Sequence, residues 1–472
     1  MEKYLKQRSK CLQQLQSNKY KGLKFTELEL QANELFKKLI FKERDLHDDL
    51  FYKVHTLKHI EYITQKSELY QAILKLPKGA VLHIHIDCCN DIEWFMKEIA
   101  FLDTSYYNEE TQCFKYIKVG EEIEKGYKSL KQERDKSQNK QEYEEKIKSI
   151  LIVQEADRIS KHNIWKLFEG KIIGINQIIY YEENFKRYLK QYLTNFAQQG
   201  VFHIEARSLL GSIFNENHQP LNIDQEVKLI QDVITQVQKE FPLFTFKIII
   251  QGLKMWDTSQ IEKYMESAIN AKKQYPDLFC GFDMVQEEDA YKNMVEMAPA
   301  LLKFPQMCKK AKVQLPFVFH GGESLEHHKN SNILDAVMMG SKRIGHGLNL
   351  SQHSYLYNKI KDKKICIEIC PVSNQILKYI DDIRCHPIKS FINYGIKVCI
   401  NPDDPGFFGY NGVAMDFYFC AVGPVLDYKD LKLCAFNSVE YSLLNKKEKK
   451  NLWSDLERRF QEWSQWMINT YK

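Results

Sequence analysis

The chain has 472 residues, enough for one large barrel with extensions. A composition of 44% hydrophobic and 27% charged residues is that of a globular protein and excludes a disordered one. The net charge of +5 is too small a bias to indicate nucleic acid as a partner, and no apolar run reaches the roughly 18 residues of a membrane-spanning helix.

Residues 1–75 predict an N-terminal helical arm. Apolar residues recur at helical spacing between Leu28 and Leu39, after Thr26, which is a favourable helix N-cap. Such an arm can pack on its own barrel or form a dimer interface. The first residues lack the apolar stretch of a secretory signal, and the twelve cysteines include no C-x-x-C pair. We therefore expect reduced thiols and a cytoplasmic protein.

Apolar runs typical of buried parallel strands then alternate with helical patterns. The runs cover residues 80–87, 201–207, 244–250, 278–284, 317–320, 342–346, 365–370 and 396–401. Eight strands with helical crossovers predict an α/β protein, a (β/α)8 TIM-type barrel over residues 76–440. A doubly wound open sheet is the alternative, although no G-x-G-x-x-G motif follows the first strand.

Two further segments accompany the predicted barrel. Residues 100–155 interrupt the alternation after the first strand and are strongly charged, which predicts a solvated helix–loop insertion. The C-terminal segment, residues 441–472, is predicted to be helical. Its tryptophans, Trp453, Trp463 and Trp466, are expected to pack against the barrel or the arm.

Polar side chains occur where several of the strands end. His83 and His85 alternate along the first strand and so project to one face. His320 ends an apolar run, and Asp403 follows the last strand. Strand ends of a barrel meet at one mouth, and three imidazoles with one carboxylate suit a catalytic zinc ion that keeps one position open. We therefore predict one Zn²⁺ per chain, bound by these four residues.

Each of these features also has a purely structural explanation. An H-x-H pair can be two hydrogen-bonded core histidines. Asp403-Asp404-Pro405 can be a turn that caps the next helix. His346 can bond to the backbone at the end of its strand. The coincidence of several such strand ends in one barrel favours the metal site.

The motifs resemble the adenosine deaminase family, in the same order along the chain. The resemblance spans about residues 20 to 440, and its motifs are Leu76–His85, His320-Gly-Gly-Glu323, Arg343–Gly347, Cys370–Gln375 and Asp403–Pro405. The segments Pro371–Lys378 and Met415–Tyr418, and the insertion, are similar to the growth-factor-type branch of that family.

The resemblance implies zinc-dependent hydrolytic deamination of adenosine or 2′-deoxyadenosine. Glu323 would protonate N1 of the purine, the role of the non-ligand glutamate in zinc deaminases. His346 would orient and help to deprotonate the attacking water. Asp403 would be both a ligand and a catalytic residue, and Asp404 would bind the purine at N7. Asp87 is implied to reach the ribose, and Trp165 to lie beside the nucleoside.

Two departures from the family pattern affect the expectations. Gln286 stands where the family has a glycine whose N–H meets purine N3, so we expect a change in affinity or base preference. The branch is typically secreted with a disulfide in its insertion, whereas only Cys113 lies in that region here. The resemblance also implies a homodimer formed by the N-terminal helices, or docking to a larger assembly. A catalytically inactive scaffold subunit and a deaminase of another aminopurine, such as AMP or adenine, remain alternatives.

Overall fold

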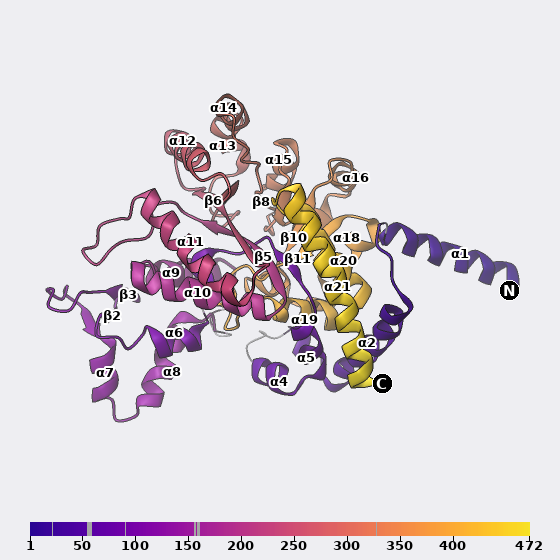
Figure 1. The fold of residues 1–472 in the computed structure, drawn as a ribbon, viewed down its shortest axis with the longest axis horizontal. Helices are drawn as coiled ribbons and strands as arrows, with labels where there is room; N and C mark the ends of the chain where they lie inside the picture. The colour runs from indigo at the N-terminus through magenta and orange to yellow at the C-terminus, as the bar shows by residue number, and fades with distance from the viewer. Residues whose placement is uncertain (21, 54–58, 90, 155–156, 158–160, 327) are drawn as a thin grey trace.

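The computed structural model describes residues 1–20, 22–53, 59–89, 91–154, 157, 161–326 and 328–472. Residues 54–58 of the expected arm and residue 155 at the end of the expected insertion lie outside this part of the chain. Within it, eight parallel strands form two four-stranded sheets with the orders β1-β5-β6-β7 and β11-β10-β9-β8 (Figure 1). The strands are β1 Gly79–Val81, β5 Val201–Ser208, β6 Thr245–Leu253, β7 Phe279–Val285, β8 His320–Gly321, β9 Arg343–His346, β10 Cys366–Ile369 and β11 Lys397–Ile400.

Backbone bridges at both edges join the two sheets into a barrel. Ile84 pairs with Asp403 between the first and last strands, and Phe282 pairs with Phe317 between β7 and β8. This arrangement confirms the predicted α/β barrel of the TIM type. The first strand is shorter than predicted because regular pairing ends at Val81. Ile84 and His85 form only single bridges, and the chain then enters the 3-10 helix Ile86–Cys88 at the barrel mouth.

Strand β5 shows how the sequence forms the barrel wall. Its apolar residues Ile204 and Ala206 alternate with Glu205 and Arg207, and all four are buried. Because successive side chains of a strand point to opposite faces, one set packs under the helices and the other lies in the barrel interior. The interior of this barrel therefore contains charged groups.

The helices of the barrel lie between and after its strands, and several of them surround the strands in Figure 1. They are α9 Lys161–Ile179, α10 Glu182–Gln198, α11 Ile223–Glu240, α12 Thr258–Gln274, α13 Met294–Leu301, α14 Phe304–Ala311, α15 Asn332–Met338, α16 Ser354–Asp362, α17 Pro371–Ile376, α18 Ile388–Tyr394, α19 Ala414–Val422 and α20 Tyr428–Tyr441. Capping boxes at Asn222 and Asp257 fix the starts of α11 and α12 by satisfying backbone N–H groups that the helix leaves free.

The segment between β1 and β5 includes a small sheet that the sequence analysis did not predict. The chain forms α6 Ile92–Glu98, then β2 Ser105–Asn108, β3 Cys113–Tyr116 and β4 Tyr127–Ser129, then α7 Leu130–Lys136 and α8 Lys140–Leu151. The three strands pair antiparallel in the order β3-β2-β4 at the left edge of Figure 1. The expectation of helix and loop alone was therefore wrong here, because strands of three or four residues leave little periodic signal.

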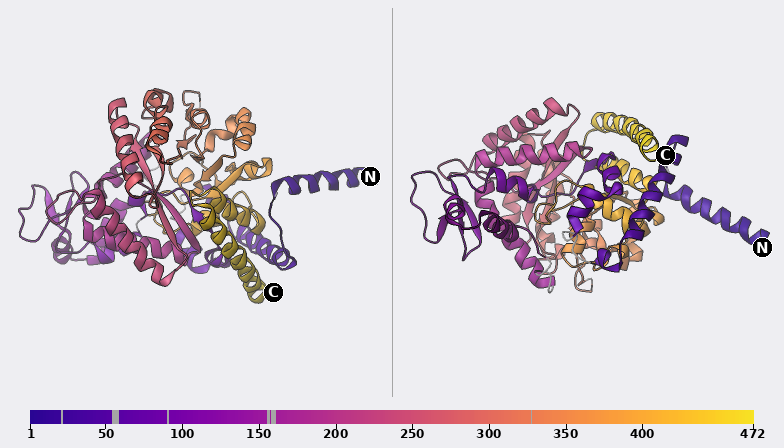
Figure 2. Two further views of the ribbon diagram at one scale, coloured as in Figure 1. Left: turned by 45° about the horizontal axis from the view of Figure 1, so that its top comes forward. Right: turned by 90° about the horizontal axis from the view of Figure 1, so that it is seen from below.

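The N-terminal helices are α1 Glu2–Lys19, α2 Glu27–Leu46, α3 Asp49–Lys53, α4 Ile60–Lys66 and α5 Glu68–Lys75. Thr26 caps α2 through a capping box, as predicted. Helix α1 projects away from the rest of the molecule in all views (Figures 1 and 2). The long C-terminal helix α21, Lys446–Tyr471, packs on α2, where the Trp463 ring meets Phe36 edge-on with centroids 5.8 Å apart.

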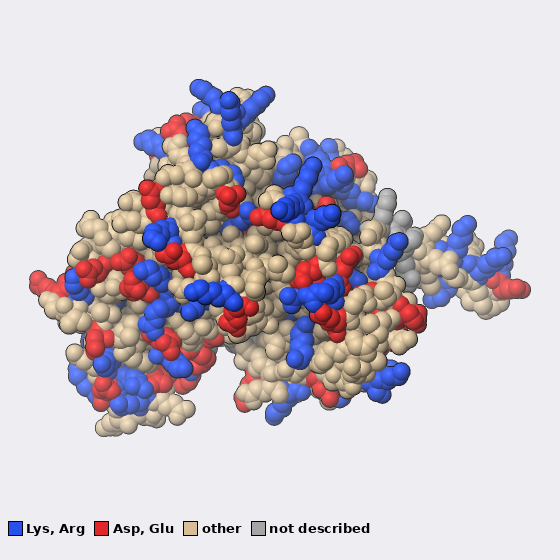
Figure 3. All heavy atoms as spheres, viewed as in Figure 1, with Lys and Arg blue, Asp and Glu red and all other residues tan. Residues whose placement is uncertain are grey.

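All twelve cysteines are free. Basic and acidic side chains are interspersed over the face shown in Figure 3, consistent with the small net charge. No helix among the described residues has both the length and the apolar character that crossing a membrane requires.

Candidate metal and active site

The four predicted metal ligands lie together at the barrel mouth. Ligand atoms of His83, His85, His320 and Asp403 are all within 4.8 Å of one another. Asp403 Oδ1 lies 3.2 Å from His83 Nε2 and 3.5 Å from His85 Nε2. The first two histidines follow β1, the third begins β8, and the aspartate follows β11, so three separate elements supply the group.

Hydrogen bonds on the far side of each ring orient the imidazoles. Nδ1 of His83 lies 2.7 Å from Glu368 Oε2, and Nδ1 of His320 lies 2.7 Å from Asp283 Oδ2. His85 Nδ1 lies 3.1 Å from the side-chain oxygen of Gln251. Because Nδ1 donates to an oxygen in each case, Nε2 keeps its lone pair for a cation.

Two of the facing atoms have no hydrogen-bond partner among the described residues. They are His83 Nε2 and Asp403 Oδ1, and both are buried. Burying polar atoms without partners costs free energy, and a cation between them removes that cost. Three imidazole nitrogens and one carboxylate oxygen are donors that zinc accepts in catalytic sites. The residues present therefore fit a zinc ion.

A second group of potential ligands overlaps the first. His346 and Cys370 lie within the same distance limit of His83 and Asp403. Burial raises the pKa of the Cys370 thiol well above its usual value, so the sulfur stays protonated. Because a thiolate and not a thiol binds metals, the group with three histidines is the better site.

Glu323 lies beside the metal site as a neutral acid. Burial raises its pKa well above the usual value, and the nearby carboxylates of Asp403 and Glu288 raise it further. Backbone N–H groups of Gly322 and Glu323 donate to Glu288 at 3.2 Å, which fixes the turn that carries the side chain. A carboxyl group that is protonated at neutral pH can donate a proton to a substrate.

His346 faces both carboxyl groups. Its Nδ1 is 3.3 Å from Glu323 Oε1, and its Nε2 is 3.8 Å from Asp403 Oδ2. Burial lowers the pKa of His346 well below its usual value, which keeps the ring neutral and able to accept a proton. Burial alone would raise the pKa of Asp403, but the His346 and His83 rings hold it well below its usual value. Asp403 therefore stays ionised.

Both His346 and Asp403 have left-handed backbone conformations, with φ of 59° and 62°. Residues with side chains rarely adopt this region, and each such residue costs about 1–3 kcal/mol. The barrel holds this strain at two neighbouring positions of the site.

A cavity of about 380 Å³ opens beside these groups. All the residues predicted for catalysis and substrate binding line it: Asp87, Trp165, Gln286, Glu323, His346, Asp403 and Asp404. Trp165 is on α9, and its indole N–H donates to the Tyr379 hydroxyl at 2.8 Å. Burial and the neighbouring Asp403 raise the pKa of Asp404, which favours a protonated carboxyl that can donate to a purine nitrogen.

Gln286 lies at the cavity rim with a φ of 105°, a conformation typical of glycine. Its side-chain oxygen accepts a hydrogen bond of 3.0 Å from the backbone N–H of Met255, and its carbonyl accepts one of 2.9 Å from Lys254 Nζ. The side chain is thus tied to Met255, which is 57% exposed. A residue with a side chain thus adopts a backbone conformation at this position that glycine adopts more readily.

The residues that hold the ligands in place were not predicted from the sequence. Asp283, Glu368 and Arg207 lie inside the barrel, and each is 0% exposed. Gln251 and Glu288 are buried too. The available signal was the occurrence of charged residues in otherwise apolar strands, since such charges are buried only with partners.

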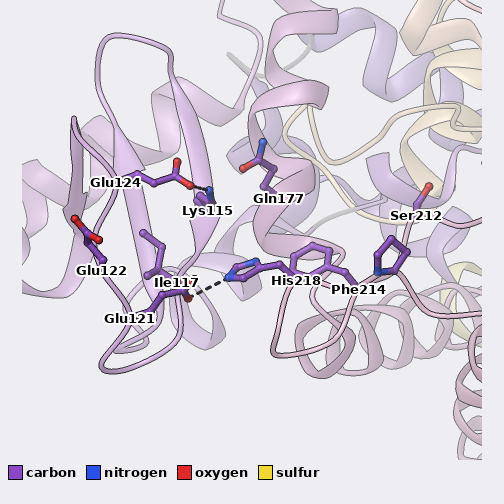
Figure 4. A pocket seen from close by; sticks show the side chains of 10 residues that line it. Lys115, Ile117, Glu121, Glu122, Glu124, Gln177, Ser212, Phe214 and His218 are labelled. Carbon is purple, nitrogen blue, oxygen red and sulfur yellow. Dashed lines mark hydrogen bonds and ion pairs between the residues drawn. The ribbon is translucent and has the colours of Figure 1, made fainter.

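A second groove, of about 490 Å³, lies between the small sheet and the loop before α11 (Figure 4). Two pairs form among its titratable groups: His218 Nε2 lies 3.0 Å from Glu121 Oε2, and Lys115 pairs with Glu124. None of the predicted site residues lines this groove. The chemistry is therefore concentrated at the barrel mouth.

Comparisons with known proteins agree with this geometry. The family model for adenosine deaminase matches residues 147–459. Adenosine deaminase 2 from Dictyostelium discoideum is 26% identical over 457 residues, covering 95% of this chain and 84% of the relative. Adenosine deaminase 2 from Homo sapiens is 28% identical over 406 residues, covering 82% and 78%.

Solved structures share the fold. Arabidopsis ADAL complexed with IMP aligns with a TM-score of 0.60 at 16% identity, covering 83% of this chain and 99% of the other. An amidohydrolase from Burkhoderia ambifaria with bound Zn gives a TM-score of 0.59 at 13% identity, covering 85% and 95%. The family match covers well over half of the chain, and the protein is therefore a deaminase, a hydrolase that belongs to the adenosine deaminase family.

Proposed function

We propose that this protein is a zinc-dependent adenosine deaminase that converts adenosine and 2′-deoxyadenosine to inosine and 2′-deoxyinosine with release of ammonia. The observation that carries the proposal is the grouping of His83, His85, His320 and Asp403 at one end of a cavity that also contains Glu323. The relatives named adenosine deaminase 2 support adenosine as the substrate.

The three histidines and Asp403 would hold the zinc ion. A bound zinc ion activates water as a nucleophile at neutral pH, because it lowers the pKa of that water toward ~7. Ser373 donates to Asp403 Oδ2 at 2.8 Å, so the other carboxylate oxygen is the one directed at His83 and His85.

The remaining side chains transfer the protons of the reaction and orient the base. Protonated Glu323 donates to N1 of the purine as water adds at C6, so that charge does not build up on the ring. Neutral His346 takes the proton that the water loses and can return it to the amino group. The C6–N bond then breaks and ammonia leaves, while the C6 hydroxyl loses its remaining proton to the ionised Glu323 and becomes the C6 carbonyl of the product. Asp404 donates a hydrogen bond to N7 and fixes the orientation of the base.

The cavity favours a nucleoside over a nucleotide. None of the described residues that line it is lysine or arginine, whereas Asp87, Glu169 and Asp404 are acidic. A phosphate dianion would find no cationic partner among these described lining residues, and such partners are what proteins use to bind phosphate. We therefore expect AMP to be a poorer substrate than adenosine.

The test is metal analysis of the purified protein, combined with an absorbance assay on adenosine, 2′-deoxyadenosine, AMP and adenine. We expect one zinc per chain and turnover of the two nucleosides. Faster turnover of AMP or adenine would replace the proposed substrate. A zinc-loaded protein that turns over none of the four would instead support the scaffold alternative.

A further inference from the structure

One guanidinium group connects the carboxylates behind two of the metal-site histidines. Arg207, on β5, is 0% exposed. Its Nε donates to Asp283 Oδ2 at 2.6 Å, and its Nη2 donates to Glu368 Oε2 at 2.8 Å. These are the same oxygens that accept from His320 Nδ1 and His83 Nδ1, at 2.7 Å each. Two rings on opposite sides of the barrel are thus oriented through one side chain.

Arg207 also binds the backbone that carries these histidines. Its Nη1 donates to the carbonyl of Leu82, directly before His83, at 3.1 Å. Its Nη2 donates at 3.2 Å to the carbonyl of Val318, on the strand that leads to the third histidine. Its own backbone N–H donates at 2.8 Å to Ile84, the residue between the two histidines of the first strand. The side chain and backbone of Arg207 therefore reach both of the segments that carry the three histidines.

We propose that Arg207 is a positioning residue that sets the metal affinity of the site, although it contacts neither the metal ligands' Nε2 atoms nor the cavity. The inference rests on the zinc site of the proposed function. Without the guanidinium, Asp283 would lose its arginine partner, Glu368 would keep only Arg343, and the two oxygens that accept from the histidine rings would no longer be held by one group. Lysine cannot replace it, because one ammonium cannot reproduce a planar fork that binds two carboxylates and two carbonyls.

Arg343 offers a matched control in the same network. It is also 0% exposed, and its Nη2 lies 2.7 Å from Glu205 Oε2. Its Nε binds Glu368 through Oε1, whereas His83 and Arg207 share Oε2. Loss of Arg343 therefore removes an equally buried charge, but Glu368 Oε2, which accepts from His83, remains hydrogen-bonded to Arg207.

The experiment compares Arg207→Lys with Arg343→Lys in the full chain. Each protein is stripped of metal, and its Zn²⁺ affinity is measured by competition with a chelator. Cobalt is then added, because its visible spectrum reports ligand geometry independently of activity. Partners behind metal ligands typically contribute about 10–100-fold in affinity, so we expect Arg207→Lys to lose at least about tenfold and to alter the cobalt spectrum. We expect Arg343→Lys to lose thermal stability but to keep most of its zinc affinity.

Equal zinc affinity in Arg207→Lys and the unmodified protein would overturn the inference, and so would equal losses in both lysine variants. If Arg207→Lys does not fold, the Asp283→Asn variant tests the inference in its place, because Arg207 reaches the His320 ring only through Asp283. An unchanged zinc affinity in that variant would refute the proposal, and a loss of at least about tenfold would support it.

The outcomes also separate this inference from the proposed function. An unmodified protein that binds no zinc would refute the zinc site and the inference with it. An unmodified protein that binds zinc and deaminates adenosine, alongside an Arg207→Lys variant of equal affinity, would refute the inference alone.

Discussion

Replacing Glu323 with glutamine tests the proposed chemistry most directly. Glutamine has nearly the same size, and the backbone hydrogen bonds from this turn to Glu288 do not involve the altered side chain. The variant can still donate a hydrogen bond from its amide, but it cannot transfer a proton. Only the acid function is removed.

The size of the effect follows from the burial of Glu323. The side chain is 3% exposed, and burial together with Asp403 and Glu288 raises its pKa, so the carboxyl is protonated at neutral pH. General acid catalysis typically contributes about 10²–10⁴-fold. We therefore expect kcat to fall by about 10²–10⁴-fold, or roughly 3–5 kcal/mol in the activation free energy.

The assay measures kcat and KM for adenosine on zinc-analysed protein across pH. In the unmodified enzyme, activity needs the protonated carboxyl and falls as the pH rises through the raised pKa of Glu323. Glu323→Gln should lack this dependence and keep its zinc, because Glu323 is not among the grouped ligands. Glu169→Gln is the matched control, a carboxyl on the cavity wall that bonds to Tyr291 at 3.0 Å.

Two results would refute this reasoning. A Glu323→Gln variant with full zinc and a kcat within tenfold of the unmodified enzyme would show that another group donates the proton. An equally large loss in Glu169→Gln would show that any change of charge in the cavity has this effect.

Three further predictions concern the metal, the buried charges and the arm. His320→Ala should lose both zinc and activity, and a variant that retains zinc by metal analysis would contradict the ligand assignment. Burial alone would raise the pKa of Glu205, but Arg343 and His203 lower it to about 2. The ionised carboxylate therefore stabilises the folded protein fully above pH 4.5, the usual pKa of a glutamate, and this stabilisation is lost as the pH falls toward 2. Glu205→Gln should therefore cost about 3–5 kcal/mol of unfolding free energy in urea at neutral pH, and clearly less in acid; an equal cost at both pH values would contradict this. We also propose that the projecting α1 contributes to a homodimer, so deletion of residues 1–18, which keeps Lys19 and its ion pair with the barrel, should halve the mass in light scattering; an unchanged mass would exclude this interface.

Much of the barrel and the ligand group could be predicted because strand ends are visible in sequence. The motif His83-Ile-His85 and the abrupt change from apolar residues to His320 mark positions where a buried strand meets the mouth. Glu323 and Asp403 follow such ends directly. The structure brings these residues together as expected.

The supporting network was not predictable in the same way. Arg207, Asp283 and Glu368 are far apart in sequence, and which charge pairs with which depends on the closure of the barrel. A single charged residue in an apolar strand also fits an exposed edge, so the pattern alone does not assign its partner. The sheet β2–β4 escaped prediction for a different reason, because its stability comes from packing and pairing and not from the periodicity of such short strands.

Two kinds of hydrogen bond close the barrel between its first and last strands: Leu82 and His83 donate to the Asn401 side chain, and longer bonds join the backbones. The His85 N–H donates to the Asp403 carbonyl at 3.4 Å, and the Asp403 N–H donates to the His83 carbonyl at 3.3 Å. Three of the four residues whose side chains form the metal site thus also join the two sheets at this edge through their backbones. An ion bound by these side chains would hold the two sheets together at this edge, and its binding would stabilise the fold by mass action. Removal of the ion should raise the rate of amide hydrogen exchange along this edge before other parts of the barrel. Chelators should therefore loosen the structure of the enzyme as well as remove its activity.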